Sequence, residues 1–187
     1  MSILIIVAVV IIVIIAFVAI GSYNSLINLK NKVQEAASDI DVQLKRRYDL
    51  IPNLISTVKG SAKFEAETLE KVIQARNSAM SITGLGEDKT QAENALSSTL
   101  KNLFALSENY PDLKSSNNFL QLQQELTNTE DRILSARRFY NQVVSDYNTA
   151  QESFPGMFFA GMAGATKQKF FELENPTVER ANIKVEF

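Results

Sequence analysis

Residues 3–20 read ILIIVAVVIIVIIAFVAI, an uninterrupted apolar run without a charged residue, proline or glycine. At about 1.5 Å per residue, a helix of this length covers about 27 Å, close to the ~30 Å hydrocarbon core of a bilayer. The run is apolar on every face, unlike an amphipathic helix of a soluble protein. We therefore expect one membrane-spanning helix that includes Ile3, Val10, Ile15 and Ile20, within an anchor segment over residues 1–22.

A cleaved signal peptide is the alternative interpretation of this run. Signal peptides have a basic start, a shorter apolar core and a small-x-small cleavage site. Only Met1 and Ser2 precede the run, and FVAIGSY at residues 17–23 is a poor cleavage site. These signatures favour an uncleaved anchor.

The composition excludes several kinds of functional site from the roughly 165 residues that follow the anchor. The 19 basic and 21 acidic residues give a net charge of −2, so we expect no nucleic acid partner. The absence of Cys excludes disulfides. The absence of His removes the usual general base near neutral pH and the commonest transition-metal ligand. We expect no cofactor, no metal site and no enzymatic activity.

Apolar residues after the anchor recur at helical spacing and predict an all-α fold. Helices are expected as a continuation of the anchor that Pro52 ends, and over residues 52–80, 89–108 and 117–153. The last helix has the most regular pattern, a seam of steps of three and four that packs helices at shallow angles. Its seam residues are Phe119, Leu122, Leu126, Thr129, Ile133, Ala136, Tyr140, Val143, Tyr147, Ala150 and Phe154. The predicted architecture is an antiparallel bundle of about four long helices over residues 23–154.

An irregular apolar C-terminal tail is predicted over residues 155–187. The sequence FPGMFFAGMAGA at 154–165 is rich in Gly and Met, and IKVEF at 183–187 alternates as a short strand would. The tail is interpreted either as a cap over the end of the bundle or as a surface for another molecule or lipid. The candidate oligomer or lipid contacts are Met157, Phe158, Phe159, Met162, Phe170, Phe171, Val185 and Phe187.

Charged residues concentrate in the first helix and in the last. The first cluster consists of Asp39, Asp41, Lys45, Arg46, Arg47 and Asp49. It is interpreted as a solvated face with ion pairs to Glu125, Glu130 or Asp131, or as a polar layer that fixes helix register or an oligomer contact. Within it, Asp41 and Lys45 have the i, i+4 spacing of a helical ion pair. The carboxylates near residue 130 cannot form a di-iron site of the Glu-x-x-His type, because the chain has no His.

Several strings resemble the LemA family of bacterial membrane proteins. They are YNSL at 23–26, DIDVQLKRRYDLIPNL at 39–54, TVKG at 57–60, ENYPDLKSSNNFLQLQQELTNTEDRI at 108–133, ARRFYN at 136–141, YN at 147–148 and FP at 154–155. Two departures are Ala37, where the family often has Trp, and Phe64, where it often has His. The resemblance implies a membrane anchor followed by a bundle of long helices, and it implies no established chemistry.

Together these features predict a non-enzymatic, membrane-anchored scaffold that self-associates as a homo-oligomer and organises membrane proteins or lipid. The alternative is an adaptor for a membrane protease or transporter. We expect a single-pass protein of the bacterial inner membrane. Lys30 and Lys32 follow the span and no Lys or Arg precedes it, which favours a cytoplasmic large domain.

Overall fold

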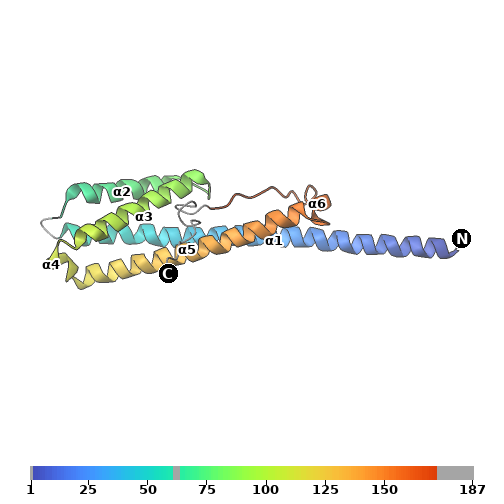
Figure 1. The fold of residues 1–187 in the computed structure, drawn as a ribbon, viewed down its shortest axis with the longest axis horizontal. Helices are drawn as coiled ribbons and strands as arrows, with labels where there is room; N and C mark the ends of the chain where they lie inside the picture. The colour runs from blue at the N-terminus through green and yellow to red at the C-terminus, as the bar shows by residue number, and fades with distance from the viewer. Residues whose placement is uncertain (1, 61–63, 172–187) are drawn as a thin grey trace, which may run out of the picture. The chain divides into compact units, whose positions relative to one another are not determined.

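The computed structural model describes residues 2–60 and 64–171, and the regular structure of these residues is entirely α-helical (Figure 1). The helices are α1 (Ser2–Lys59), α2 (Ala66–Ser81), α3 (Glu87–Ser107), α4 (Pro111–Lys114), α5 (Asn117–Glu152) and α6 (Gly156–Phe159). The predicted all-α fold is confirmed. The strand predicted at residues 183–187 lies outside the described residues.

The chain forms two compact units, and both long helices contribute to each of them. Of the described residues, the anchor unit contains those from the start of α1 to Asp39 and from Arg138 to Lys169, and the bundle unit contains those between Ile40 and Arg137 together with Phe170 and Phe171. The domain boundaries predicted after residues 22 and 154 remain predictions.

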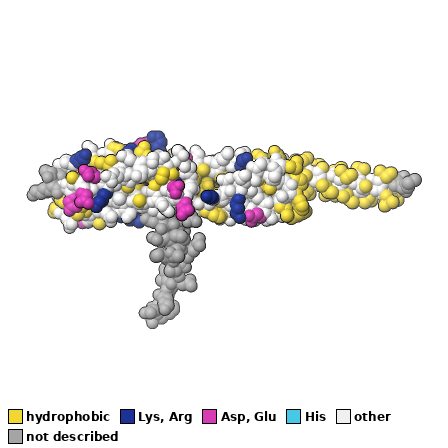
Figure 2. All heavy atoms as spheres, turned by 90° about the horizontal axis from the view of Figure 1, so that it is seen from above, with side chains coloured by type: hydrophobic (Ala, Val, Ile, Leu, Met, Phe, Trp, Pro, Cys, Tyr) yellow, Lys and Arg dark blue, Asp and Glu magenta, His cyan; other side chains and the backbone are white. Residues whose placement is uncertain are grey.

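The anchor unit begins with the apolar half of α1. Every described side chain from Ile3 to Val18 is exposed, and the most apolar window has a mean hydropathy of 3.8 (Figure 2). This helix is long and apolar enough to cross a membrane. Beyond the run, α1 changes to an amphipathic pattern and buries Leu26, Val33 and Ala36.

Besides the short α4, the described part of the bundle unit has four long helical segments around one apolar core. They are the last third of α1, α2, α3 and the first half of α5, and α2 and α3 pack against each other (Figure 1). The core residues are spaced by three and four along each segment, as the burial of one helix face requires. They include Ile40, Leu44, Ile51, Leu54, Leu69, Val72, Leu96, Leu103, Leu126 and Ile133.

Two predicted helix boundaries are wrong, because burial overrides a local signal. Pro52 lies inside α1, which continues to Lys59. A proline within a helix costs about 3 kcal/mol, and the buried side chains of Ile51, Leu54 and Val58 on the same stretch offset that cost. The second helix therefore begins at Ala66 rather than at Pro52.

The seam predicted for the last helix is confirmed over most of its length. α5 begins at Asn117 and ends at Glu152, one residue before the predicted end. Phe119, Leu126, Ile133 and Tyr147 are all buried on this helix. Phe154 follows the end of α5 and is exposed, so the seam does not extend to it.

Candidate functional site

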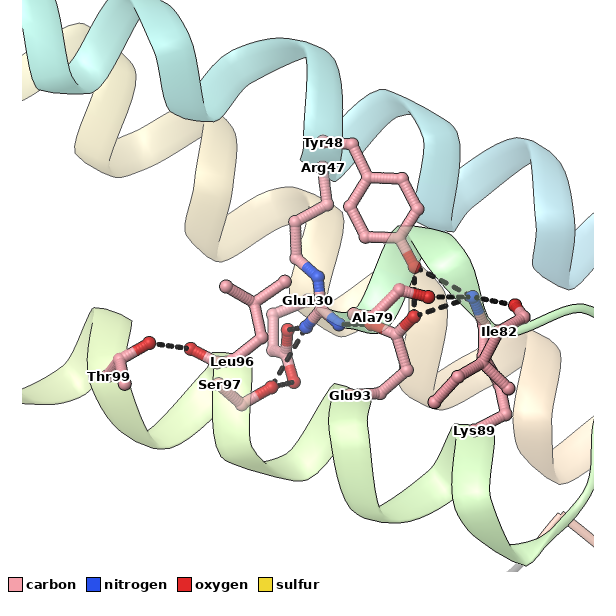
Figure 3. Close-up of polar contacts among 10 residues, drawn as sticks. All are labelled: Arg47, Tyr48, Ala79, Ile82, Lys89, Glu93, Leu96, Ser97, Thr99 and Glu130. Carbon is pink, nitrogen blue, oxygen red and sulfur yellow. Dashed lines mark hydrogen bonds and ion pairs between the residues drawn. The ribbon is translucent and has the colours of Figure 1, made fainter. Parts of the chain in front are cut away.

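A buried arginine on α1 is the centre of a polar cluster in the bundle unit (Figure 3). The Arg47 side chain is 0% exposed as a residue, and its guanidinium reaches two other helices. Arg47 Nη1 donates to Ser97 Oγ of α3 at 2.9 Å and to Glu130 Oε2 of α5 at 2.6 Å. Arg47 Nη2 donates to Glu93 Oε2 of α3. One guanidinium thus connects α1 to both α3 and α5.

Glu93 is the fully buried carboxylate of the cluster, and it has three partners. Besides Arg47, it accepts a hydrogen bond from the Tyr48 hydroxyl at Oε1, and Lys89 Nζ lies 3.2 Å from the same oxygen (Figure 3). Burial raises the pKa of the Tyr48 phenol, and the hydrogen bond to Glu93 and the charge of that carboxylate raise it further. The phenol therefore remains protonated and donates to Glu93.

Lys89 extends the cluster to the C-terminal end of α2. Its Nζ donates to the carbonyl oxygens of Ala79 at 2.7 Å and Ile82 at 3.1 Å, and to the Tyr48 hydroxyl at 3.0 Å. The last carbonyls of a helix have no partners within the helix, so a lysine there satisfies them and interacts favourably with the helix dipole. Arg76 of α2 donates from Nε to the Tyr48 carbonyl at 2.9 Å. All four segments of the bundle are therefore joined by these side chains.

The charges of this cluster balance. Two cations, Arg47 and Lys89, face two carboxylates, Glu93 and Glu130. A buried ion pair contributes little net stability, but removal of one partner leaves an uncompensated charge in a poorly solvated site. We define Arg47, Tyr48, Lys89, Glu93, Ser97 and Glu130 as the ion cluster. Its geometry is suited to fixing the register of the helices.

In the described part of the chain, the ion cluster reaches solvent through Glu130. The Glu130 side chain is 41% exposed, whereas those of Arg47 and Glu93 are 1% and 0% exposed. Glu130 borders a groove of about 210 Å³ between α3 and α5, whose lining residues are Ser97, Leu100, Lys101, Phe104, Leu126, Thr127, Glu130 and Asp131. Among the described residues, no three side chains of the Asp, Glu, Cys or His type gather as a metal site would require.

The structure separates the predicted Asp39–Asp49 cluster into one buried residue and five exposed ones. Asp39, Asp41, Lys45, Arg46 and Asp49 are exposed, and only Arg47 enters the core. Lys45 pairs with Asp49 at 3.1 Å, so the predicted Asp41–Lys45 pair is wrong. The predicted ion pairs between helices form as Arg46–Glu125 at 2.6 Å and Arg47–Glu130.

The predicted contact residues of the tail also differ in their exposure to solvent. Met157, Phe158, Met162 and Phe170 are exposed, and Phe159 is half-buried.

The prediction of Phe171 as an exposed contact residue is wrong. It is 0% exposed, because its ring packs in the bundle unit beneath the Arg137 guanidinium at 4.4 Å. Val185 and Phe187 lie outside the described residues.

Sequence reasoning missed four members of the ion cluster, namely Tyr48, Lys89, Glu93 and Ser97. The helix over residues 89–108 is predicted from apolar periodicity alone, which does not distinguish buried polar residues from exposed ones. Lys89, Glu93 and Ser97 are spaced by four, and Glu93 and Ser97 flank the buried Leu96. Three polar residues that follow one helix face next to its apolar stripe were the available signal.

Comparison with known proteins agrees with this helical, membrane-associated architecture. The profile of the LemA family matches residues 36–187. Protein LemA of Metamycoplasma hominis is 32% identical over 141 residues, which cover 74% of this chain and 63% of that protein. Magnetosome protein MamQ 2 of Paramagnetospirillum magneticum is 22% identical over 175 residues, which cover 80% and 64%. Magnetosome protein MamQ of Magnetospirillum gryphiswaldense is 22% identical over 174 residues, with the same coverage.

The matched region thus spans a little under two thirds of the length of each of these curated relatives. The family profile covers most of the chain, including every helix of the bundle unit and the whole of the ion cluster. The chain belongs to the LemA family.

Proposed function

We propose that this protein is a non-enzymatic, membrane-anchored scaffold that self-associates at the bilayer and organises membrane proteins or lipid. The observation that supports this proposal best is the mutual pairing of the buried charged residues. In the ion cluster, each charged group contacts an oppositely charged group from another helix or a neighbouring turn. Such an arrangement holds helices in place and leaves none of these groups as an activated nucleophile or base.

The anchor supports self-association by a physical argument. A membrane-spanning helix would confine all copies to two dimensions with a common orientation, which raises their effective concentration. The surface of the protein includes large exposed apolar side chains, among them Val42 on α1 and Leu134 and Phe139 on α5. At that effective concentration, weak contacts through such residues suffice for assembly.

The copy number of the protein tests this proposal. Light-scattering mass of the full-length protein in mild detergent should show a homo-oligomer of several copies, and cross-linking in native membranes should give the same assembly. A monomer in both measurements would contradict the scaffold.

The adaptor is the second candidate, and the groove between α3 and α5 favours it. Leu100, Phe104 and Leu126 make its floor apolar, and Lys101, Glu130 and Asp131 supply charges at its edge. A groove of this kind accepts an apolar side chain of a partner and orients it by polar contacts. An adaptor should remain a monomer or small oligomer until its partner protein is added.

We also propose that the bundle unit lies in the cytoplasm and the anchor in the inner membrane. Lys30 and Lys32 follow the apolar run, and positively charged residues near a span favour the cytoplasmic side. The chain has no Cys, and Ser98 is exposed on α3, so Ser98→Cys introduces a single accessible thiol. An impermeant thiol reagent should label this variant only after cell lysis. Labelling of intact cells would place the bundle unit outside.

A further inference from the structure

We propose that residues 153–166 are a second membrane contact, which enters the lipid interface beside the point where α1 leaves the bilayer. The proposal rests on the anchoring role of α1 and is independent of self-association. The segment lies entirely within the anchor unit and contains α6. We call it the interfacial segment.

The interfacial segment exposes apolar side chains and carries no charge. Its sequence, SFPGMFFAGMAGAT, has no Asp, Glu, Lys or Arg. Phe158 and Met162 are 66% and 77% exposed, and Phe154 and Met157 are also exposed. All four side chains are more than half exposed, and the rings of Phe154 and Phe158 pack edge to face, with their centroids 6.0 Å apart. An exposed apolar patch of this kind marks a contact with a partner or a membrane.

The position of the segment identifies the bilayer as that partner. A Cβ atom built on Gly156 would lie 3.9 Å from Ser22 Oγ, so α6 packs beside α1 two residues after the apolar run ends at Ile20. In Figures 1 and 2, α6 and a band of hydrophobic side chains lie where the bare part of α1 begins. If residues 3–20 span the hydrocarbon core, Ser22 lies at headgroup level, and the interfacial segment lies there with it.

The backbone of the segment is suited to a poorly hydrated site. Groups that enter lipid need hydrogen-bond partners within the protein, because water is scarce there. The N–H groups of Met157, Phe158 and Ala160 donate to the carbonyls of Ser153, Pro155 and Gly156. Those of Ala163, Gly164 and Ala165 donate to the carbonyls of Phe159, Gly161 and Ala160. Six amides in this short stretch are therefore satisfied inside it.

The segment is also fixed to α5 at both of its ends. At the start, a Cβ on Gly156 would lie 1.9 Å from the Ala150 carbonyl oxygen, so only glycine permits this close approach. At the end, Asn148 exchanges two hydrogen bonds of 2.9 Å with the backbone of Gln168, and Lys167 pairs with Glu152 at 2.8 Å. A segment held in this way presents its apolar side chains without a large ordering cost on insertion.

Single-cysteine fluorescence tests the proposal on the full-length protein, which has no native Cys. Phe158→Cys reports on the interfacial segment, and Ser145→Cys, on an exposed position of α5 more than one turn from the contact with Gly156, is the matched control in the same unit. Val10→Cys reports on the anchor. Each variant is labelled with an environment-sensitive dye, reconstituted in phosphatidylcholine vesicles, and checked for unchanged helicity by circular dichroism.

Two quenchers then distinguish lipid from water. In the Phe158→Cys variant we expect blue-shifted emission, quenching by a lipid with a spin label close to its headgroup, and loss of quenching by aqueous iodide. In the Ser145→Cys variant we expect the reverse. In the Val10→Cys variant we expect quenching by a lipid with a spin label deep in its chain.

Three results would overturn the proposal. Iodide quenching in the Phe158→Cys variant that equals the control would leave the segment in water. Protection from both quenchers would indicate that a second copy of the protein covers it. If the Val10→Cys variant is not quenched by the deep lipid label, the anchor itself fails, and the scaffold proposal fails with it.

Discussion

The two ends of α1 differ in the side chains that they expose and bury. Near its N-terminus the helix exposes valine and isoleucine on every face, and near its C-terminus it buries Arg47. In water both choices would be unfavourable, because exposed apolar surface and a buried charge each carry a cost. Paired carboxylates stabilise the buried arginine, and a hydrocarbon core would stabilise the exposed apolar run. The helix pattern of a membrane-anchored protein therefore has to be interpreted with two solvents in mind.

The largest expected effect comes from charges placed in the apolar end. Val10→Arg combined with Ile14→Arg should oppose membrane insertion by about 5–7 kcal/mol, since each charge near the centre of a span costs roughly 2.5–3.5 kcal/mol. The control is Val42→Arg combined with Leu134→Arg, which changes two exposed apolar residues of the bundle unit. The measurement is the fraction of protein that remains in the membrane after alkaline extraction. Equal retention of the two double variants would remove the distinction between the two ends.

The next effect separates two neighbouring arginines at the polar end. Arg47→Met should lower the free energy of unfolding by about 3–5 kcal/mol, because it leaves Glu93 buried without its guanidinium partner. Arg46→Met is the matched control, and it should cost no more than about 1 kcal/mol, because the Arg46–Glu125 pair is half-exposed. Denaturant unfolding in detergent, followed by circular dichroism, measures both. Similar losses for the two variants would show that burial of Arg47 does not matter.

A smaller effect should depend on pH. Tyr48→Phe should cost about 1–3 kcal/mol, because Glu93 loses a hydrogen-bond donor. The pKa of Tyr48 is raised in the folded state, so the folded protein holds this proton more tightly than the unfolded chain does. Its contribution is fully present below a pH of about 10, the ordinary tyrosine value, and is lost as the pH rises further.

The pH dependence of unfolding in the full-length protein checks this sign. Stability should decline less steeply above pH ~10 in the Tyr48→Phe variant than in the unaltered protein. Tyr140→Phe is a useful comparison, because burial also raises the pKa of Tyr140, but its hydroxyl donates to the neutral Lys169 carbonyl. An identical slope with and without the Tyr48 hydroxyl would contradict the assigned role.

The helices could be predicted from the periodic apolar residues of the sequence. The buried polar residues of the core could not be predicted in this way. The regular seam of α5 predicted its start at Asn117, because one buried face determines a long helix. Pro52 was a misleading local signal, since tertiary packing of the neighbouring side chains decides whether a helix continues.

The members of the ion cluster were harder to predict from the sequence than the helices. Arg46 and Arg47 are chemically identical and adjacent, and only the angular position of each on α1 decides which one is buried. Glu93 appears as an ordinary surface glutamate until α3 is placed against α1. The burial of Phe171 likewise depends on the packing of a distant segment, the Arg137 region of α5.

The most direct test of one helix in two solvents compares two exposed valines of α1. Val10 is 51% exposed and Val42 is 59% exposed, so their accessibility within the protein is nearly the same. The Val10→Cys and Val42→Cys variants are treated with a water-soluble thiol reagent in native membranes that expose both of their faces to it. Any difference in labelling rate between the two variants then comes from the bilayer. We predict rapid labelling of the Val42→Cys variant and no labelling of the Val10→Cys variant until detergent and denaturant are added. Equal labelling of both variants in the intact bilayer would show that the apolar end of α1 is not in lipid, and would contradict the anchored scaffold.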